Sequence, residues 1–297
     1  MEIKKAQRQQ VKLRLGLSGA SGFGKTYSAL LLAYGITNDY SKIVVIDTEN
    51  QSASLYAHLG DFNTVCLEPP YSPERYVKAI KLCESAGMEV VIVDSITHEW
   101  NGTGGCLEIH EKLGGRFQDW APVSKRHQAF IDAILQSTCH IITTVRSKID
   151  YSLDVGSNGK TKVVKHGTKE ITREGFEYEL TANFELLNEN HMAKASKDRT
   201  GLFMNKPEFV INAAIGRKLM EWCNNGFDFE KAKTEINSCE TVEGLRHIYA
   251  KYPNQQKLLL ADIMNRKAIL EDSSSQVVPN NQIIEPKNQI RNGNSNS

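Results

Sequence analysis

The chain is predicted to be an α/β protein with a mostly parallel central sheet flanked by helices. Three observations predict this fold. Continuous apolar runs of four to six residues recur and end in polar residues, helix-like segments separate them, and a glycine-rich segment joins the first strand to the first helix. A fully apolar run is typical of a strand covered on both faces, as in parallel sheets. The 297 residues are enough for one large domain of this kind and a small appendage.

The glycine-rich segment is the most specific motif in the chain. A strand is expected over Val11–Leu17, where polar and apolar residues alternate, and a buried helix over Tyr27–Tyr34. Between them, residues 19–26 read G-x-x-x-x-G-K-T, the phosphate-binding loop of P-loop nucleotidases. The alternative is a glycine-rich turn that matches by chance, but the flanking strand and helix favour a functional loop. The predicted nucleotide-binding residues are Gly19, Ala20, Ser21, Gly22, Phe23, Gly24, Lys25, Thr26 and Tyr27.

Each part of this loop has an expected task. Glycines let the backbone approach a phosphate closely, and the N–H groups at the start of the helix face the anion. Lys25 is expected to neutralise the β- and γ-phosphates of ATP, and Thr26 to bind Mg²⁺.

The remaining elements of the expected core alternate along the chain. A helix that begins near a proline is predicted over 73–86 and another over 121–137. Apolar runs predict strands at Ile43–Ile46, Val90–Val93 and His140–Val145. Strand-like pieces follow at Phe176–Leu180, Ala182–Leu187 and His191–Ser196. Ligands of parallel sheets bind at the carboxyl ends of the strands. The polar residues expected at those ends are Glu49, Asp94, Thr144 and Arg146.

Two of these acids suggest hydrolysis. Asp94 follows an apolar strand, as does the Walker B aspartate that orients Mg²⁺ through water; the alternative is an aspartate that caps a turn. Hydrolysis also needs a group that positions the attacking water. Ser95 follows Asp94, so this group must come from elsewhere, and Glu49 is the candidate; alternatively, Glu49 is a surface acid.

These residues resemble the RecA-like recombinase family over roughly residues 11–220. The matching runs are Ile46-Asp-Thr-Glu49, Val91-Ile-Val-Asp-Ser95 and Thr143-Thr-Val-Arg-Ser-Lys148. The resemblance implies that Glu49 is catalytic, that Tyr56 stacks on adenine, and that the third run senses the γ-phosphate and opens a mobile DNA-binding loop. It also implies that Lys197 and Arg199 reach the nucleotide of a neighbouring subunit; alternatively, they are a strand-end pair that faces water.

The chain departs from the family at two points. Thr144 stands where the family usually has a sensor glutamine, so coupling between nucleotide and DNA is expected to differ. The first ten residues leave no room for an N-terminal polymerisation domain, so the chain resembles core-only, phage-encoded annealing proteins of the Sak group. The expected organisation is a polar segment (1–10), a RecA-like ATPase core (11–226), a helical region (227–271) and a disordered tail (272–297).

Two segments are candidates for single-stranded DNA binding, which combines positive charge with aromatic side chains. One is a glycine-rich loop over 99–119, and the other a basic loop or hairpin over 147–173. The alternative is that both are solvated loops, and that Trp100 belongs to the core. The predicted DNA-binding residues are Arg116, Arg146, Lys148, Lys160, Lys162 and Lys165.

Composition and charge argue against a strongly basic nucleic-acid-binding protein, a membrane protein and a secreted protein. The 36 Lys and Arg balance 35 Asp and Glu, so nucleic acid would have to bind a local patch. No apolar run reaches 18 residues and the N-terminus lacks a signal-like stretch, so a cytoplasmic protein with no membrane contact is expected, in a bacterial host if it is phage-encoded. The six cysteines have no C-x-x-C spacing and the histidines, including His127 and His191, no metal spacing. Buried free thiols are expected, and no metal site of this kind.

The sequence therefore predicts a Mg²⁺-dependent ATPase that binds single-stranded DNA and assists recombination or annealing. The expected cofactors are ATP and Mg²⁺. A homo-oligomer is expected, because Lys197 and Arg199 would act between subunits, with a single-strand-binding protein or helicase as a further partner. One alternative is a nucleotide-dependent switch or loader with little turnover, which would not need Glu49. A small-molecule kinase is another, in which 147–173 would be a basic lid.

Overall fold

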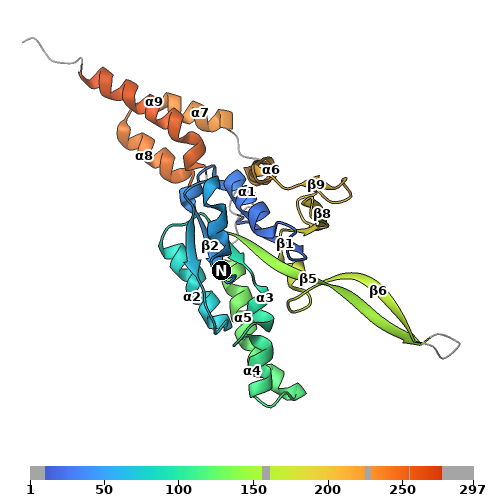
Figure 1. Ribbon diagram of the computed structural model, residues 1–297. Coiled ribbons are helices and arrows are strands. Elements are labelled where there is room, and N and C mark those ends of the chain that lie inside the picture. The colour runs from blue at the N-terminus through green and yellow to red at the C-terminus, as the bar shows by residue number, and fades with distance from the viewer. Residues whose placement is uncertain (1–10, 156–160, 225–228, 254, 276–297) are drawn as a thin grey trace, which may run out of the picture. The chain divides into compact units, whose positions relative to one another are not determined.

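A computed structural model gives the structure of the protein (Figure 1). It describes residues 11–155, 161–224, 229–253 and 255–275. The chain divides into two compact units, 1–225 and 226–297.

The first unit is built on one sheet, and the predicted fold class is confirmed. The strand order is β3-β2-β4-β5-β1-β7-β8-β9, in which the first six strands run parallel and β8 and β9 are antiparallel additions. The strands are β1 (Arg14–Gly19), β2 (Ile43–Asp47), β3 (Asn63–Cys66), β4 (Val90–Asp94), β5 (His140–Val155), β7 (Ala182–Leu186), β8 (Met192–Asp198) and β9 (Phe209–Val210).

Helices cover both faces of this sheet, as the fully apolar strands require. Alternate residues of β2 point to opposite faces: Val45 joins a core with α1 (Lys25–Thr37) and α6 (Ala213–Asn224), and Val44 joins one with α2 (Pro73–Ser85) and α5 (Trp120–Gln136). Helices α1 and α6 approach closely because glycines face each other. A Cβ on Gly35 would lie 2.1 Å from the carbonyl oxygen of Ala213.

Two local predictions are wrong. Residues 99–119 are not one loop but contain α3 (Thr97–Asn101), α4 (Cys106–Lys112) and the 3₁₀ turn η4 (Phe117–Asp119), and the glycines occupy the turns between them. The apolar residues of 176–180 belong to another 3₁₀ turn, η5 (Phe176–Glu179), and not to a strand. Phe176 and Leu180 are both buried, but Tyr178 between them is 67% exposed, so the residues do not follow the two-residue alternation of a strand. Two further 3₁₀ turns are η2 (Tyr40–Lys42) and η3 (Ser52–Leu59).

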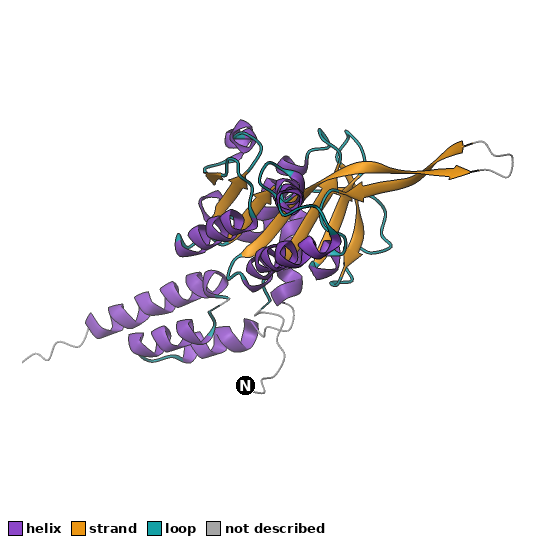
Figure 2. Cartoon of the chain, turned by 90° about the horizontal axis from the view of Figure 1, so that it is seen from below, coloured by secondary structure: helices purple, strands orange, loops and turns teal. Residues whose placement is uncertain are grey.

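The basic segment is a hairpin. β5 continues past the sheet edge and pairs antiparallel with β6 (Thr161–Glu170), and the two form a ribbon that extends from the sheet (Figure 2). Lys148 lies on β5, and Lys162 and Lys165 on β6. Lys160 lies outside the described residues.

The second unit consists of helices α7 (Phe229–Ser238), α8 (Val242–Lys251) and α9 (Gln256–Ser275). Its small core is formed by Ala232, Ile236, Leu245, Leu259 and Ile263. Helix α9 continues past residue 272, where the sequence predicts a disordered tail to begin; residues 276–297 lie outside the described part. No helix in the part of the chain that the structure describes has the length and apolar character needed to cross a membrane.

Candidate nucleotide-binding site

The glycine-rich loop connects β1 to α1 directly. β1 ends at Gly19 and α1 begins at Lys25, so the N-terminus of a thirteen-residue helix faces the loop. Gly22 and Gly24 both have φ of 84°, a left-handed conformation that glycine adopts without strain. The backbone N–H groups at this turn can therefore face an anion, and the helix dipole adds to the attraction.

Lys25 is held inside the loop. Its Nζ donates hydrogen bonds to the carbonyl oxygens of Gly19 at 3.0 Å and Ala20 at 2.9 Å. Burial lowers the pKa of Lys25, and the nearby carboxylates of Asp94 and Glu49 oppose this shift. The lysine is thus a buried cation that a phosphate can engage.

Asp94 is the centre of a hydroxyl-bonded cluster at the end of β4. Thr26 Oγ1 donates to its Oδ2 at 2.5 Å, and Thr144 Oγ1, on neighbouring β5, donates to its Oδ1 at 2.5 Å. Burial raises the pKa of Asp94, whereas these two hydrogen bonds lower it. Thr144 is itself fully buried, so its hydroxyl acts on the site through Asp94.

Glu49 is paired with Arg146. Arg146 Nη2 lies 2.8 Å from Glu49 Oε1, and Nε donates to the same oxygen at 2.9 Å. Ser95 Oγ donates to it more weakly, at 3.4 Å. Burial alone would raise the pKa of Glu49, but the hydrogen bond and charge of Arg146 outweigh it and the pKa is lowered. Glu49 is therefore a carboxylate, and its charge is shared with an arginine.

A cavity of 380 Å³ is lined by these residues and by most of the predicted nucleotide-binding residues. Tyr27 and Tyr56 line it with ring centroids 5.7 Å apart, tilted by 52°. Two aromatic rings on one side of a phosphate loop suit a nucleobase. The lining residues are Ser21, Gly22, Gly24, Lys25, Thr26, Tyr27, Glu49, Ser52, Leu55, Tyr56, Asp94, Arg146 and His191.

His191 is a member of the site that sequence reasoning missed. It lies just before β8, and its Nδ1 donates to the carbonyl oxygen of Phe23 at 2.9 Å. A Cβ on Gly24 would lie 2.5 Å from that Nδ1, so the histidine packs directly on the loop. The contact joins positions 168 residues apart, and no local spacing in the sequence could reveal it.

Other predicted residues lie outside this cavity. Lys197 and Arg199 converge on one acceptor, since both donate to the carbonyl oxygen of Tyr178, and neither lines the cavity of its own chain. Arg116 is exposed and paired with Asp119 at 3.2 Å. Their predicted contacts with a second subunit or with DNA stay predictions.

The residues present fit a magnesium ion bound with ATP. Mg²⁺ prefers hard oxygen ligands and keeps several waters, so it needs few protein groups. Thr26 Oγ1 and the Asp94 carboxylate are such oxygens, and they lie within hydrogen-bond distance of each other beside Lys25. Thr26 would bind the ion directly, and Asp94 would bind it through water.

A second hollow, of 510 Å³, shares the Glu49–Arg146 pair with the first. Both residues line it, together with residues from the ends of β2 and β3, including Glu68 and Tyr71. The ion pair therefore contributes to the lining of both hollows.

The chain is similar to a known family model and to a solved structure. Residues 11–210 match the family model described as AAA domain. A solved structure of an ATPase from the type III secretion system of pathogenic bacteria is similar, with a TM-score of 0.36 and 15% identity; the match covers 62% of this chain and 57% of that one. The chain thus matches little more than half the length of that protein. No curated protein matches.

Proposed function

Because this chain belongs to the AAA domain family and carries a P-loop ATPase domain, we propose that it hydrolyses ATP in a Mg²⁺-dependent reaction coupled to single-stranded DNA. Recombination or annealing, in a phage-encoded system, is the process that we propose it serves. The observation that carries the proposal is the convergence of Lys25, Asp94 and Glu49 on one cavity beneath two tyrosines.

Each residue has a defined part in hydrolysis. Tyr27 and Tyr56 bind the base, and Lys25 turns from the loop carbonyls to the β- and γ-phosphates. Mg²⁺, when bound, supplies charge neutralisation of the phosphates. Glu49 positions the attacking water, for which a low pKa is sufficient, since in a dissociative phosphoryl transfer positioning matters more than basicity.

Arg146 connects this reaction to the proposed DNA-binding hairpin. It lies on β5 beyond Thr144, at the point from which β5 continues into the ribbon, and it holds Glu49. DNA bound along the ribbon, with Lys148 as one exposed contact, would shift Arg146 and free Glu49 for water. We propose that DNA stimulates hydrolysis in this way.

Lys197 and Arg199 support an oligomeric active form. Both lie at the end of β8, gathered at the Tyr178 carbonyl and outside the cavity of their own chain. A cation brought to the γ-phosphate stabilises the charge of the transition state. We propose that a neighbouring subunit receives this pair, so hydrolysis per chain rises with protein concentration.

The test is steady-state ATP hydrolysis across protein concentration, with and without single-stranded DNA and Mg²⁺. Lys25→Ala serves as the blank. Stimulation by DNA that grows with concentration supports the proposal. A rate that depends on Mg²⁺ but does not change when DNA is added would indicate an ATPase whose activity is not coupled to DNA.

The Glu49–Arg146 pair also favours a second candidate, a nucleotide-dependent switch that recruits a replication or recombination partner, such as a single-strand-binding protein or helicase. A glutamate held by arginine is withdrawn from water, which would make turnover slow. Tight ATP binding with a near-zero rate under all the conditions above would support the switch.

A further inference from the structure

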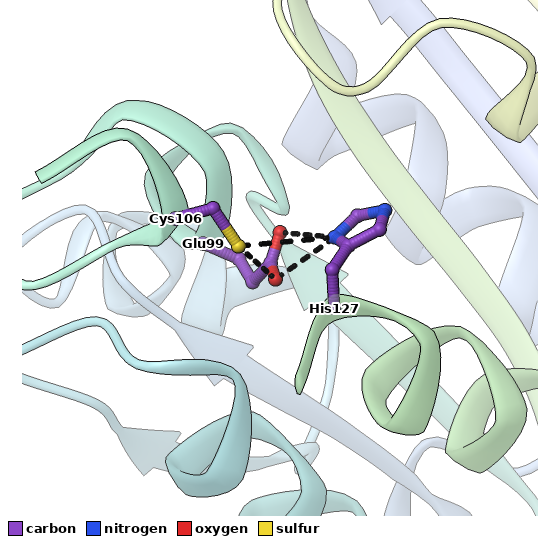
Figure 3. Close-up of side chains that lie close together, drawn as sticks. All are labelled: Glu99, Cys106 and His127. Carbon is purple, nitrogen blue, oxygen red and sulfur yellow. Dashed lines mark hydrogen bonds and ion pairs between the residues drawn. The ribbon is translucent and has the colours of Figure 1, made fainter. Parts of the chain in front are cut away.

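A buried cluster of three side chains lies away from the nucleotide cavity. Glu99 comes from α3, Cys106 begins α4, and His127 lies in α5 (Figure 3). They are 0%, 0% and 3% exposed. The residues share no local motif, since the fold alone brings together positions separated by seven and twenty-one residues. The proposed ATPase function uses none of them.

The donor atoms of the cluster face one another, as Figure 3 shows. His127 Nδ1 lies 3.0 Å and 3.1 Å from the two oxygens of Glu99, Cys106 Sγ lies 3.1 Å from Oε1, and Sγ and Nδ1 are 4.0 Å apart. Zinc bonds of about 2.0–2.3 Å in a tetrahedron place the ligand atoms about 3.3–3.6 Å apart. The observed separations bracket this spacing, so a small inward or outward shift of each group would accommodate an ion.

The chemistry of the three groups selects the type of ion. Thiolate and imidazole ligands favour Zn²⁺ and Co²⁺ over the hard ions Mg²⁺ and Ca²⁺. If both carboxylate oxygens of Glu99 bound the ion, the three residues would give a distorted four-coordinate site, because the oxygens of one carboxylate lie closer together than two ligands of a regular tetrahedron. A divalent cation would also neutralise the charges of one carboxylate and one thiolate, which matters because a buried charge without a counter-charge is unfavourable. Among the described residues, the ion pair that Glu99 makes is with His127.

The backbone around the cluster is built to hold it. Gly105 precedes Cys106, and a Cβ there would lie 2.7 Å from the carbonyl oxygens of His98 and Glu99. This close approach presses the start of α4 onto α3 and sets Cys106 beside Glu99. On the other side, Trp100 stacks on Trp120 and meets the His127 ring edge-on, with centroids 5.5 Å apart. Aromatic groups thus fix the imidazole.

We propose that Glu99, Cys106 and His127 form a structural site for a borderline-soft divalent metal ion, Zn²⁺ or its substitute Co²⁺. Binding replaces the thiol proton of Cys106, and any proton on Nδ1, with the metal, and both protons pass to solvent. The ion joins α3, α4 and α5. Because α3 begins three residues after Asp94, and Thr97 Oγ1 accepts a hydrogen bond from the Arg146 N–H, it also stiffens the base of the nucleotide site.

The test uses the full-length protein, loaded with Co²⁺ or Zn²⁺ and then desalted. We expect one metal ion per chain by elemental analysis and, with Co²⁺, a near-ultraviolet charge-transfer band from a thiolate ligand. Cys106→Ser should remove the band and lower the affinity at least about 100-fold, because loss of an outer-shell partner alone costs about 10–100-fold. Two control variants should keep both the charge-transfer band and the metal affinity. They are Cys139→Ser, at a buried cysteine outside the cluster, and Cys66→Ser, at an exposed cysteine.

Two results would overturn the proposal. One is wild-type protein that retains no Co²⁺ or Zn²⁺ and shows no rise in melting temperature when either is added, which would make the cluster a hydrogen-bonded group alone. The other is a band that survives Cys106→Ser but disappears with Cys66→Ser, which would place the metal on the surface. The wild-type measurements need no variant to fold, and neither readout depends on ATP hydrolysis.

Discussion

Arg146 reaches across a strand to hold Glu49. The sheet order is β2-β4-β5, so the pair connects the end of β2 to the point where β5 leaves the parallel sheet, across β4, with Arg146 Nη2 2.8 Å from Glu49 Oε1. Asp94 and Ser95 lie beneath this bridge, and Ser95 adds a third donor to Glu49. This ion pair therefore connects the proposed water-positioning group, Glu49, to the strand that continues into the hairpin, and both of its residues line the nucleotide cavity.

Glu49→Gln is expected to lower kcat for ATP by about 10²–10⁴-fold, the usual contribution of a group that positions or activates water. ATP affinity should change little, because the amide keeps the shape of the side chain and Lys25 and the loop remain. The measurement is steady-state hydrolysis beside equilibrium binding of a fluorescent ATP analogue. Glu68→Gln, at a carboxylate that lines only the adjoining hollow, is the matched control. A variant with normal turnover would remove Glu49 from the reaction.

Arg146→Ala is expected to abolish the dependence of hydrolysis on DNA. Without the arginine, Glu49 loses the hydrogen bond that holds its carboxylate, so hydrolysis should be similar with and without single-stranded DNA, and the ratio should fall to about one. Arg126→Ala breaks another arginine–glutamate pair, with Glu74 at 2.6 Å, and should leave the ratio unchanged. If Arg146→Ala keeps the wild-type ratio, the coupling passes through another residue.

His191→Ala is expected to weaken ATP binding about fivefold, which corresponds to loss of one hydrogen bond of about 1 kcal/mol. The imidazole fixes the Phe23 carbonyl and packs on Gly24, so its removal loosens the phosphate loop. His247→Ala, at an exposed histidine of the second unit, is the control. Unchanged affinity in His191→Ala would show that the loop holds its shape alone.

Gly24 and His191 also show why part of the site could be predicted and part could not. The strand, loop and helix of the P-loop are adjacent in sequence, and Asp94 and Glu49 follow apolar runs whose carboxyl ends must meet in a parallel sheet. These relationships follow from chain order. His191 reaches the loop from the distant start of β8, and such a contact depends on packing that no residue pattern encodes.

The error at 99–119 has a related cause. A high density of glycine suggests a loop, but glycines at turns also permit short helices such as α4 to pack tightly. The expectation of no metal site also rests on local spacing and stays a prediction, because Glu99, Cys106 and His127 come together only after three helices have packed. The spacing of residues along the sequence does not reveal contacts that form only when helices pack in the tertiary structure.

His140 supplies a prediction about pH and stability. It is buried at the start of β5, where Nδ1 accepts the N–H of Leu13 at 3.0 Å, and burial, aided by Lys12 and Arg14, lowers its pKa from 6.5 to about 3. Between these values the unfolded chain binds a proton that the folded chain excludes. The free energy of unfolding should therefore fall as pH drops below 6.5, by up to about 1.4 kcal/mol per pH unit.

His140→Asn isolates this contribution, because an asparagine oxygen can still accept from Leu13 but does not titrate. Urea unfolding at pH 7, 6 and 5 should give a wild-type stability that declines about 2 kcal/mol more than that of the variant, since the window opens near pH 6.5. The comparison uses the change in the free energy of unfolding between pH values, so a packing defect that lowers the stability of the variant equally at every pH does not affect it. If both proteins lose stability in parallel, His140 is protonated in the folded state and its hydrogen bond to Leu13 does not hold the imidazole neutral.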